Sequence, residues 1–168
     1  ELAKVDVAVL SVNRKEWATP ALRKALFDFA NAGKGLILLH PGLWYNFADW
    51  PEYNRVLAGG GARGHDKLGE FTINVLKQDH PITKGVTASF KITDELYYMT
   101  ADPEGTPIEV LAETSPSLKF KHPHPSVFVV KHSKARIAGI APGHDERAHD
   151  LPEYKKLLVN AVNWAARK

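Results

Sequence analysis

The sequence predicts an α/β fold, and three consecutive segments near its start carry this prediction. Residues 5–12 and Gly35–Leu39 are short apolar runs of the kind that is buried in a parallel sheet. Between them, Thr19 can cap a helix that begins at Pro20, whose fixed φ suits the first helical position. A strand, a helix and a second strand in this order are typical of a right-handed βαβ unit.

The rest of the chain adds short strands and two helices. Strands are expected at residues 70–76, 90–92, 108–112, 127–130 and 136–140, and the last two can form a hairpin through Ser133. A short helix is expected near residues 52–57 and a closing helix over residues 153–166. No repeat or linker interrupts the sequence, so a single domain, residues 1–168, accounts for the whole chain.

The composition excludes several classes of protein. The chain has 44% hydrophobic and 24% charged residues, which is ordinary for a globular domain and unlike a disordered one. It has no cysteine, which rules out a disulfide scaffold, a thiolate zinc site and a cysteine nucleophile. No apolar run approaches the roughly 18 residues of a membrane span, so no membrane partner is expected. The net charge of +3 comes from scattered basic residues, which argues against a nucleic-acid partner.

Two histidines follow predicted strands. His40 comes directly after Gly-Leu-Ile-Leu-Leu, and His144 follows the strand at residues 136–140 through Ala-Pro-Gly. Ligands of open parallel sheets bind beyond the carboxyl ends of the strands, so both imidazoles are candidates for a functional site. Each also has a structural interpretation, because the backbone could satisfy His40 and Asp145 could simply cap a turn after His144.

Two further candidates lie in polar segments. His65 follows a triple glycine on an expected loop, and Glu95 belongs to Thr-Asp-Glu-Leu-Tyr-Tyr, where an acidic pair precedes an aromatic pair. A carboxylate among aromatic residues can act as a general base or a metal ligand. The alternative is that Thr93, Asp94 and Glu95 cap the first turn of a helix. The remaining histidines are expected in a turn, at a strand end or exposed to solvent: His80, His122, His124, His132 and His149.

Six short motifs together resemble the ThuA-like (trehalose-utilisation) family. In chain order they are Gly-Leu-Ile-Leu-Leu-His40, Gly-His65, His80-Pro81-Ile82, Asp94-Glu95-Leu96-Tyr97, Gly143-His144-Asp145 and Asn160-Ala161-Val162-Asn163-Trp164-Ala165. Their order and spacing span nearly the whole chain. The sequence departs from the family in one turn, because the Gly-x-Gly-Arg before the last strand keeps only its arginine, Arg136.

The resemblance implies a fold and a site. Such domains resemble class I glutamine amidotransferases, which implies a flavodoxin-like three-layer sandwich with a mostly parallel central sheet and an N-terminal unit missing before Glu1. By position, His40 stands where the amidotransferases have their nucleophilic cysteine, and His144 stands near their catalytic histidine. His65 and Glu95 would join them as catalytic residues around one pocket. The substrate contacts of that pocket would come from Trp44, Tyr45, Asp94, Tyr97 and Asp145.

The implied role is in bacterial sugar metabolism, and without cysteine no amidotransferase activity is expected. Three imidazoles and a carboxylate can serve as acid and base for hydrolysis, isomerisation or elimination on a sugar or keto-sugar derivative. The same side chains (His40, His65, Glu95 and His144) suit Zn²⁺ or a similar divalent metal, whereas no phosphate-loop motif indicates a nucleotide cofactor.

Two other functions are compatible with the sequence. One is a non-catalytic carbohydrate-binding or regulatory module, which the lost glycines near Arg136 favour. The other is a structural domain that binds a partner through the aromatic loop at residues 44–50. The sequence leaves open whether the protein is a homo-oligomer and whether it is cytoplasmic or periplasmic.

Overall fold

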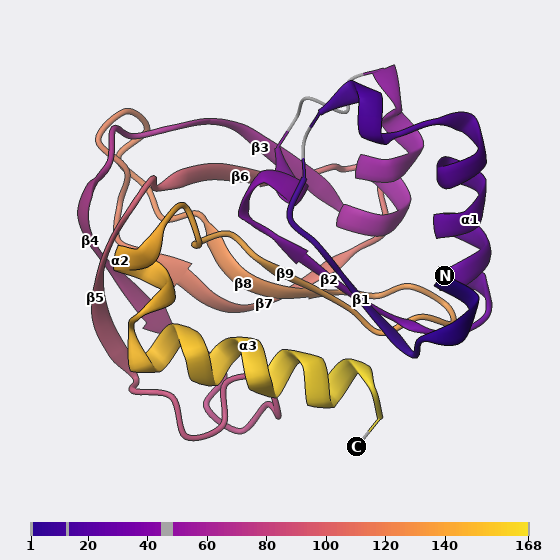
Figure 1. Cartoon of the computed structure of the whole chain (residues 1–168). Helices are drawn as coiled ribbons and strands as arrows, with labels where there is room; N and C mark the ends of the chain where they lie inside the picture. The colour runs from indigo at the N-terminus through magenta and orange to yellow at the C-terminus, as the bar shows by residue number, and fades with distance from the viewer. Residues whose placement is uncertain (1, 13, 45–48, 168) are drawn as a thin grey trace.

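The computed structural model describes residues 2–12, 14–44 and 49–167, which form a sheet with helices on both faces (Figure 1). Its strands are β1 (Val7–Leu10), β2 (Gly35–Leu39), β3 (Gly60–His65), β4 (Gly69–Val75), β5 (Ser89–Asp94), β6 (Tyr97–Ala101), β7 (Ile108–Thr114), β8 (Pro125–Val130) and β9 (Ile137–Ile140). Its α-helices are α1 (Pro20–Asn31), α2 (Glu146–His149) and α3 (Pro152–Ala165). The helix expected near residues 52–57 is a π-helical segment, Tyr53–Ala58.

The main sheet has seven strands in the order β1-β2-β9-β8-β7-β4-β5. Strands β1, β2 and β9 are parallel neighbours, and the remaining neighbours in this order are antiparallel. Because each antiparallel step reverses the direction, β1, β2, β9, β7 and β5 all run the same way. The α/β class and the hairpin of β8 and β9 are therefore confirmed, but parallel pairing is confined to three strands.

A second sheet was not expected from the sequence. Strands β3 and β6 pair antiparallel as a two-stranded ribbon, so His65 ends a strand instead of lying on a loop. The alternative of a helix whose first turn is capped by Thr93, Asp94 and Glu95 is wrong, because Thr93 and Asp94 end β5 and Glu95 lies in the short connection to β6. The glycines at 60 and 61 have no side chains to show the alternation of a strand, which explains why the pattern was missed.

The first strand–helix–strand unit forms as predicted. Leu22 donates its backbone N–H to the Thr19 hydroxyl at 3.3 Å, and Pro20 is the first residue of α1. Strand β2 is apolar along its length because it is covered on both faces. Its residues Leu36 and Leu38 belong to the core under α1, whereas Ile37 belongs to the core under α3.

An apolar core lies on each face of the main sheet. On one face, α1, the π-helical segment and the β3–β6 ribbon cover the core residues Leu26, Phe29, Leu57, Met99 and Phe128. On the other face, α3 packs the core residues Tyr154, Leu157, Ala161, Ile37 and Val129. This arrangement brings the carboxyl ends of β2 and β9 together. His40 follows β2 directly, and His144 follows β9 after a short loop.

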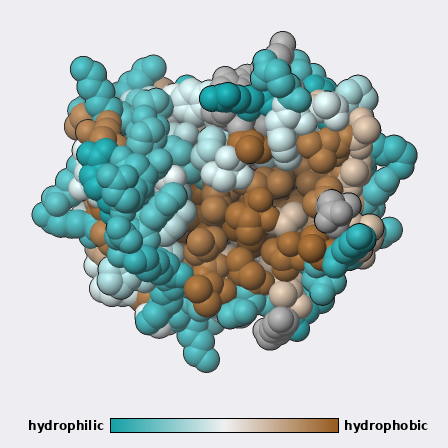
Figure 2. Space-filling model, viewed as in Figure 1, coloured by the Kyte–Doolittle hydropathy of each residue, from teal (hydrophilic) through white to brown (hydrophobic). Residues whose placement is uncertain are grey.

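The surface over β1, β2 and the neighbouring part of α3 is apolar (Figure 2). The exposed side chains of these elements include Val9, which is 48% exposed, and Val159, which is 59% exposed. Among the described residues, no helix is long and apolar enough to cross a membrane.

One histidine lies in a different environment from the one expected. His124 was predicted to be exposed, but its side chain is buried where β8 begins, with 3% of its surface exposed. Its Nδ1 lies 3.4 Å from the Met99 carbonyl oxygen and its Nε2 lies 3.1 Å from the Ser117 hydroxyl. The flanking prolines give no sequence signal of this burial, because the burial depends on contact with the β3–β6 ribbon.

This burial makes stability depend on pH. Desolvation lowers the pKa of His124 below its ordinary value, so the folded state favours the neutral imidazole. Its contribution to stability is present above the unfolded pKa of about 6.5 and is lost as the pH falls through the folded pKa. We expect the thermal midpoint to fall between about pH 7.5 and pH 5, and to fall less in His124→Gln.

The matched control is His122→Gln, because His122 is exposed on the same loop. This variant should lessen the fall only slightly, because burial is the main cause of the lowered pKa of His124 and the nearby His122 adds a smaller part. An equal fall in His124→Gln and in the wild type would show that His124 does not contribute to the acid sensitivity.

Candidate functional site

His40 is held in a constrained position at the end of β2. Its backbone φ is +35°, which is unusual for a residue with a side chain, and the residue is only 4% exposed. Its Nδ1 lies 2.8 Å from the Ala141 carbonyl oxygen and donates to it, so Nε2 carries the free lone pair. Burial lowers the pKa of this imidazole, which favours a neutral base that faces the site.

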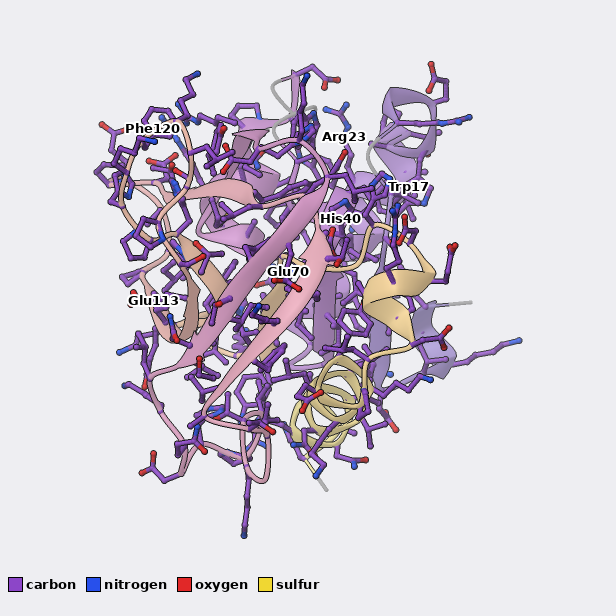
Figure 3. The ribbon with its side chains drawn as sticks, turned by 90° about the vertical axis from the view of Figure 1, so that its left-hand side faces the viewer. Trp17, Arg23, His40, Glu70, Glu113 and Phe120 are labelled. Carbon is purple, nitrogen blue, oxygen red and sulfur yellow. The ribbon has the colours of Figure 1, made fainter. Side chains whose placement is uncertain are left out.

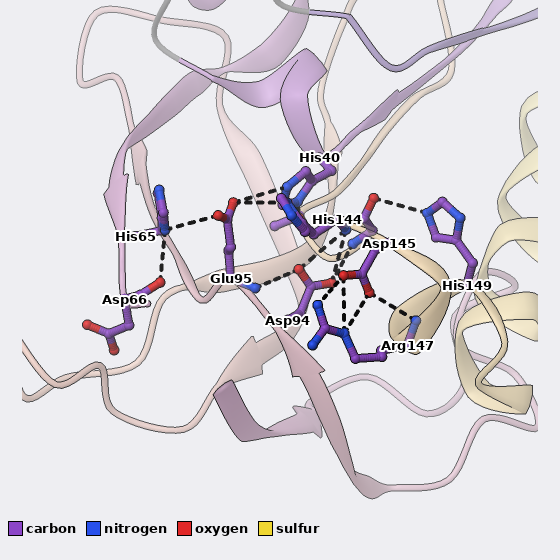
Figure 4. A network of polar contacts seen from close by, with 11 residues as sticks. His40, His65, Asp66, Asp94, Glu95, His144, Asp145, Arg147 and His149 are labelled. Atoms are coloured by element: carbon purple, nitrogen blue, oxygen red, sulfur yellow. Dashed lines mark hydrogen bonds and ion pairs between the residues drawn. The ribbon is translucent and has the colours of Figure 1, made fainter. Parts of the chain in front are cut away.

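Glu95 is the centre of the site (Figure 4). Its Oε2 lies 3.5 Å from His40 Nε2 and 3.3 Å from His144 Nδ1, and its Oε1 lies 3.6 Å from His65 Nδ1. The structure therefore brings together the four predicted catalytic residues, which come from four separate segments. Figure 3 shows His40 near the middle of the side of the molecule that carries β4 and β5, with Phe120 at its edge.

The access of solvent differs among the three imidazoles. The side chains of His144 and His65 are 43% and 33% exposed, whereas that of His40 is 5% exposed. His65 Nδ1 also lies 2.8 Å from the carbonyl oxygen of Asp66. His144 and His65 are therefore open to a ligand from solvent, and His40 forms the floor of the site.

Three of these residues could hold a metal ion. Ligand atoms of His40, Glu95 and His144 all lie within 4.8 Å of one another. Two imidazoles and a carboxylate are a common ligand set for zinc, and the bond from His40 Nδ1 to a carbonyl is the usual orientation of a ligating histidine. The donor set therefore fits a divalent metal, with His65 outside the closest group.

Asp94 joins two parts of the site through their backbones. It is 1% exposed, and its Oδ1 accepts the N–H of Glu95 at 2.6 Å. Its Oδ2 accepts the N–H of Gly143 at 2.7 Å, and the N–H of His144 lies 3.3 Å from Oδ1. These bonds tie the segment that carries Glu95 to the segment that carries His144. The carboxylate of Asp94 is buried beneath the site instead of lining it.

Asp145 caps α2, as the structural interpretation of the sequence allowed. Its Oδ1 accepts the backbone N–H of Arg147 at 3.0 Å, and both carboxylate oxygens bond the Arg147 guanidinium. The Arg147 side chain lowers the pKa of Asp145 to about 2. The carboxylate therefore stays charged and occupied by its own helix.

Aromatic rings pack against two histidines of the site, His40 and His65. Tyr97 stacks on His40 with ring centroids 4.2 Å apart, and burial raises the pKa of its phenol, so the hydroxyl stays protonated. Trp44 lies 5.5 Å from the His65 ring and 5.3 Å from the Tyr97 ring. Tyr45, the other predicted wall residue, lies outside the described residues.

His149 is exposed, as the sequence predicts, and it also supports the loop before His144. Its Nε2 lies 3.0 Å from the Gly143 carbonyl oxygen, and its ring stacks on Tyr154 at 5.2 Å. Gly143 has a φ of +131°, and a Cβ there would lie 2.7 Å from the Tyr154 hydroxyl. The loop before His144 thus requires glycine. Sequence spacing gave no signal for His149, because its contact depends on how α2 and α3 fold back on this loop.

Arg136 lies away from the site. It precedes β9, at the end opposite to His144, and its Nη1 donates to the carbonyl oxygen of Trp164 at 2.7 Å near the end of α3. The glycines lost beside Arg136 therefore do not line the candidate site, and their loss does not argue for a domain without chemistry.

Comparison with known proteins identifies the family. The family model for ThuA, described as trehalose utilisation, matches residues 1–165. The chain belongs to the ThuA family. No curated protein matches the chain.

Solved structures show the same fold as this ThuA domain. A putative ThuA-like protein from Parabacteroides merdae is 23% identical with a TM-score of 0.82, and the match covers 99% of this chain and 72% of that one. A putative ThuA-like protein from Bacteroides uniformis is 24% identical with a TM-score of 0.78, covering 98% and 70%. A β-galactosidase from Bacillus circulans is 14% identical with a TM-score of 0.64, covering 98% of this chain and 22% of that one. At these identities the matches show the fold alone, which is of the flavodoxin-like and glutamine amidotransferase-like type.

Proposed function

We propose that this ThuA domain is an enzyme that acts on a sugar or keto-sugar derivative through His40, His65, Glu95 and His144. One observation carries the proposal: a single carboxylate lies within 3.6 Å of imidazole nitrogens from three separate segments. A cluster of acid–base groups that combines a buried and an exposed imidazole is typical of an active site. The description of the family as trehalose utilisation supports a carbohydrate as the substrate.

The environments of the histidines suggest a division of roles. Burial lowers the pKa of His40 and favours its neutral form, so its Nε2 would accept a proton from a group bound above it. His144 is the most exposed of the three and faces Glu95 through Nδ1, so it would exchange a proton with the substrate. Such a pair suits proton transfer in hydrolysis, isomerisation or elimination next to a carbonyl.

The buried carboxylate of Asp94 would position other residues of the site. Within the described residues, the Asp94 carboxylate accepts hydrogen bonds from backbone N–H groups alone, so we assign it the placement of Glu95 and His144. Trp44 and Tyr97 would supply the apolar walls that pack against the C–H faces of a sugar ring. Asp145 would have an indirect role, because it caps α2, the helix that begins two residues after His144.

A divalent metal would change this division of roles, because it would take the lone pair of His40 Nε2 that otherwise accepts a proton. His40, Glu95 and His144 would hold it, and a bound metal would supply Lewis acidity and an activated water. His65 would then stay free to exchange protons with the substrate.

A sugar-conversion assay tests the proposed function. Aldoses, ketoses and disaccharides, trehalose among them, are incubated with the protein and followed by ¹H NMR. We expect the wild type to convert at least one of them and His144→Ala to convert it about 10²-fold more slowly or worse. The circular dichroism spectrum should be unchanged, because this side chain is 43% exposed. Binding without any conversion would support the carbohydrate-binding alternative instead. Loss of folding in the variant would make His144 a structural residue.

The metal is tested separately by plasma mass spectrometry on untagged protein. If the three ligands act together, the wild type carries a near-stoichiometric divalent ion and the His40→Ala, His144→Ala double variant loses it. A metal content that the double variant retains would contradict the assigned ligands.

A further inference from the structure

A hollow lies at the end of the sheet opposite to Glu95. Its volume is about 490 Å³, and it is lined by Asp79, Pro81, Lys84, Arg136, Asn160, Asn163 and Trp164. It is bounded by the turn after β4, the residue before β9 and the C-terminal half of α3, which runs beside that turn in Figure 1. A volume of this size is within the range of small-molecule sites.

The walls of this hollow are fixed to one another. Asn160 Nδ2 donates to the carbonyl oxygens of Ile82 and Lys84, at 3.0 and 3.1 Å, which ties the turn to α3. The Arg136 guanidinium lies 5.5 Å from the centroid of the Trp164 ring, and the His80 ring lies 5.7 Å from it, tilted by 55°. The turn and α3 are therefore fixed relative to each other, and a ligand would need to order only the side chains at the rim.

Three polar side chains at the rim of this hollow are available to bind a ligand. Within the described part of the chain, the side chains of Asp79, Lys84 and Asn163 are exposed and make no hydrogen bond or ion pair. Together they offer a carboxylate acceptor, an ammonium donor and an amide that does both. The guanidinium of Arg136 already donates to the Trp164 carbonyl oxygen and packs against its ring, so the charged groups that remain free at the rim are one carboxylate and one ammonium.

We propose that this hollow is a second carbohydrate site that binds a neutral mono- or disaccharide. Hydroxyl groups need donors and acceptors in alternation, which the three rim side chains supply, and Trp164 and Pro81 supply apolar surface for a sugar ring. The site is separate from the histidine cluster and does not depend on the proposed reaction. Strand β9 and helix α3 each extend from this hollow toward the cluster.

The test is a titration of ¹⁵N-labelled protein with trehalose and, separately, with glucose. One of the two sugars should shift the Trp164 indole and Asn163 amide signals saturably, in the wild type and in His144→Ala alike. Asp79→Ala should weaken this binding by about fivefold or more, judged from the Trp164 signal, because it removes the acceptor. Asn163→Ala should act in the same direction.

Three results would overturn the proposal. The first is the absence of a saturable shift at Trp164 with either sugar up to about 50 mM. The second is an unchanged affinity in both rim variants. The third is a shift produced by inorganic phosphate and not by the sugars, which would make the hollow an anion site. Since His144→Ala lacks the proposed chemistry, binding here is decided independently of turnover.

Discussion

Glu95→Gln is expected to lower kcat for the converted sugar on the order of 10³-fold, the range typical of a lost acid–base group. Glutamine has nearly the same shape as glutamate, but its amide cannot accept a proton or balance imidazolium charge on three sides. The loss should therefore appear in kcat more than in KM. The rate is measured by NMR on the substrate that the conversion assay identifies.

The matched control is Glu70→Gln, because Glu70 is an exposed residue of β4 that pairs with Lys91. This variant should keep the wild-type rate. Equal rates in Glu95→Gln and the wild type would show that the central carboxylate takes no part in the chemistry.

Asp94→Ala is expected to have the largest effect on stability of the substitutions considered. It leaves the N–H groups of Glu95, Gly143 and His144 without their buried acceptor. Unsatisfied buried donors cost about 1–3 kcal/mol each, so we expect a loss of about 3 kcal/mol or more in the free energy of unfolding. For a domain of this size that corresponds to a fall of about 10 °C in the melting temperature.

The companion variants are Asp94→Asn and Asp145→Ala. Asparagine keeps one acceptor oxygen, so its loss of stability should be intermediate. Asp145→Ala removes a cap from a short helix at the surface and should cost clearly less than Asp94→Ala. A melting temperature of Asp94→Ala close to that of the wild type would contradict the role given to Asp94 as the link between the two segments.

The parts of the fold that follow local rules could be predicted from the sequence. The Thr19 cap, the start of α1 at Pro20 and the strand Gly35–Leu39 all appear where expected. In each case the signal lies within a few neighbouring residues. The ribbon of β3 and β6 could not be predicted in this way, because its glycines carry no side-chain pattern and its pairing joins residues that are distant in the chain.

For the candidate site, too, only the features that follow local rules could be predicted from the sequence. His40 and His144 could be placed by the rule that ligands bind beyond the carboxyl ends of strands, and they do lie together. The distance of Glu95 from both, the buried role of Asp94 and the support from His149 depend on tertiary contacts. Sequence reasoning could name acidic residues as candidates, but it could not tell the one that lines the site from the one beneath it.

The central claim is that His144 and Glu95 belong to one reactive centre, and a double-mutant cycle tests it most directly. The value of kcat/KM is measured for the wild type, Glu95→Gln, His144→Ala and the double variant. Residues that act as a unit are strongly non-additive, so the double variant should be no slower than the worse single variant. A loss equal to the product of the two single losses would show that they act independently, and would contradict this account.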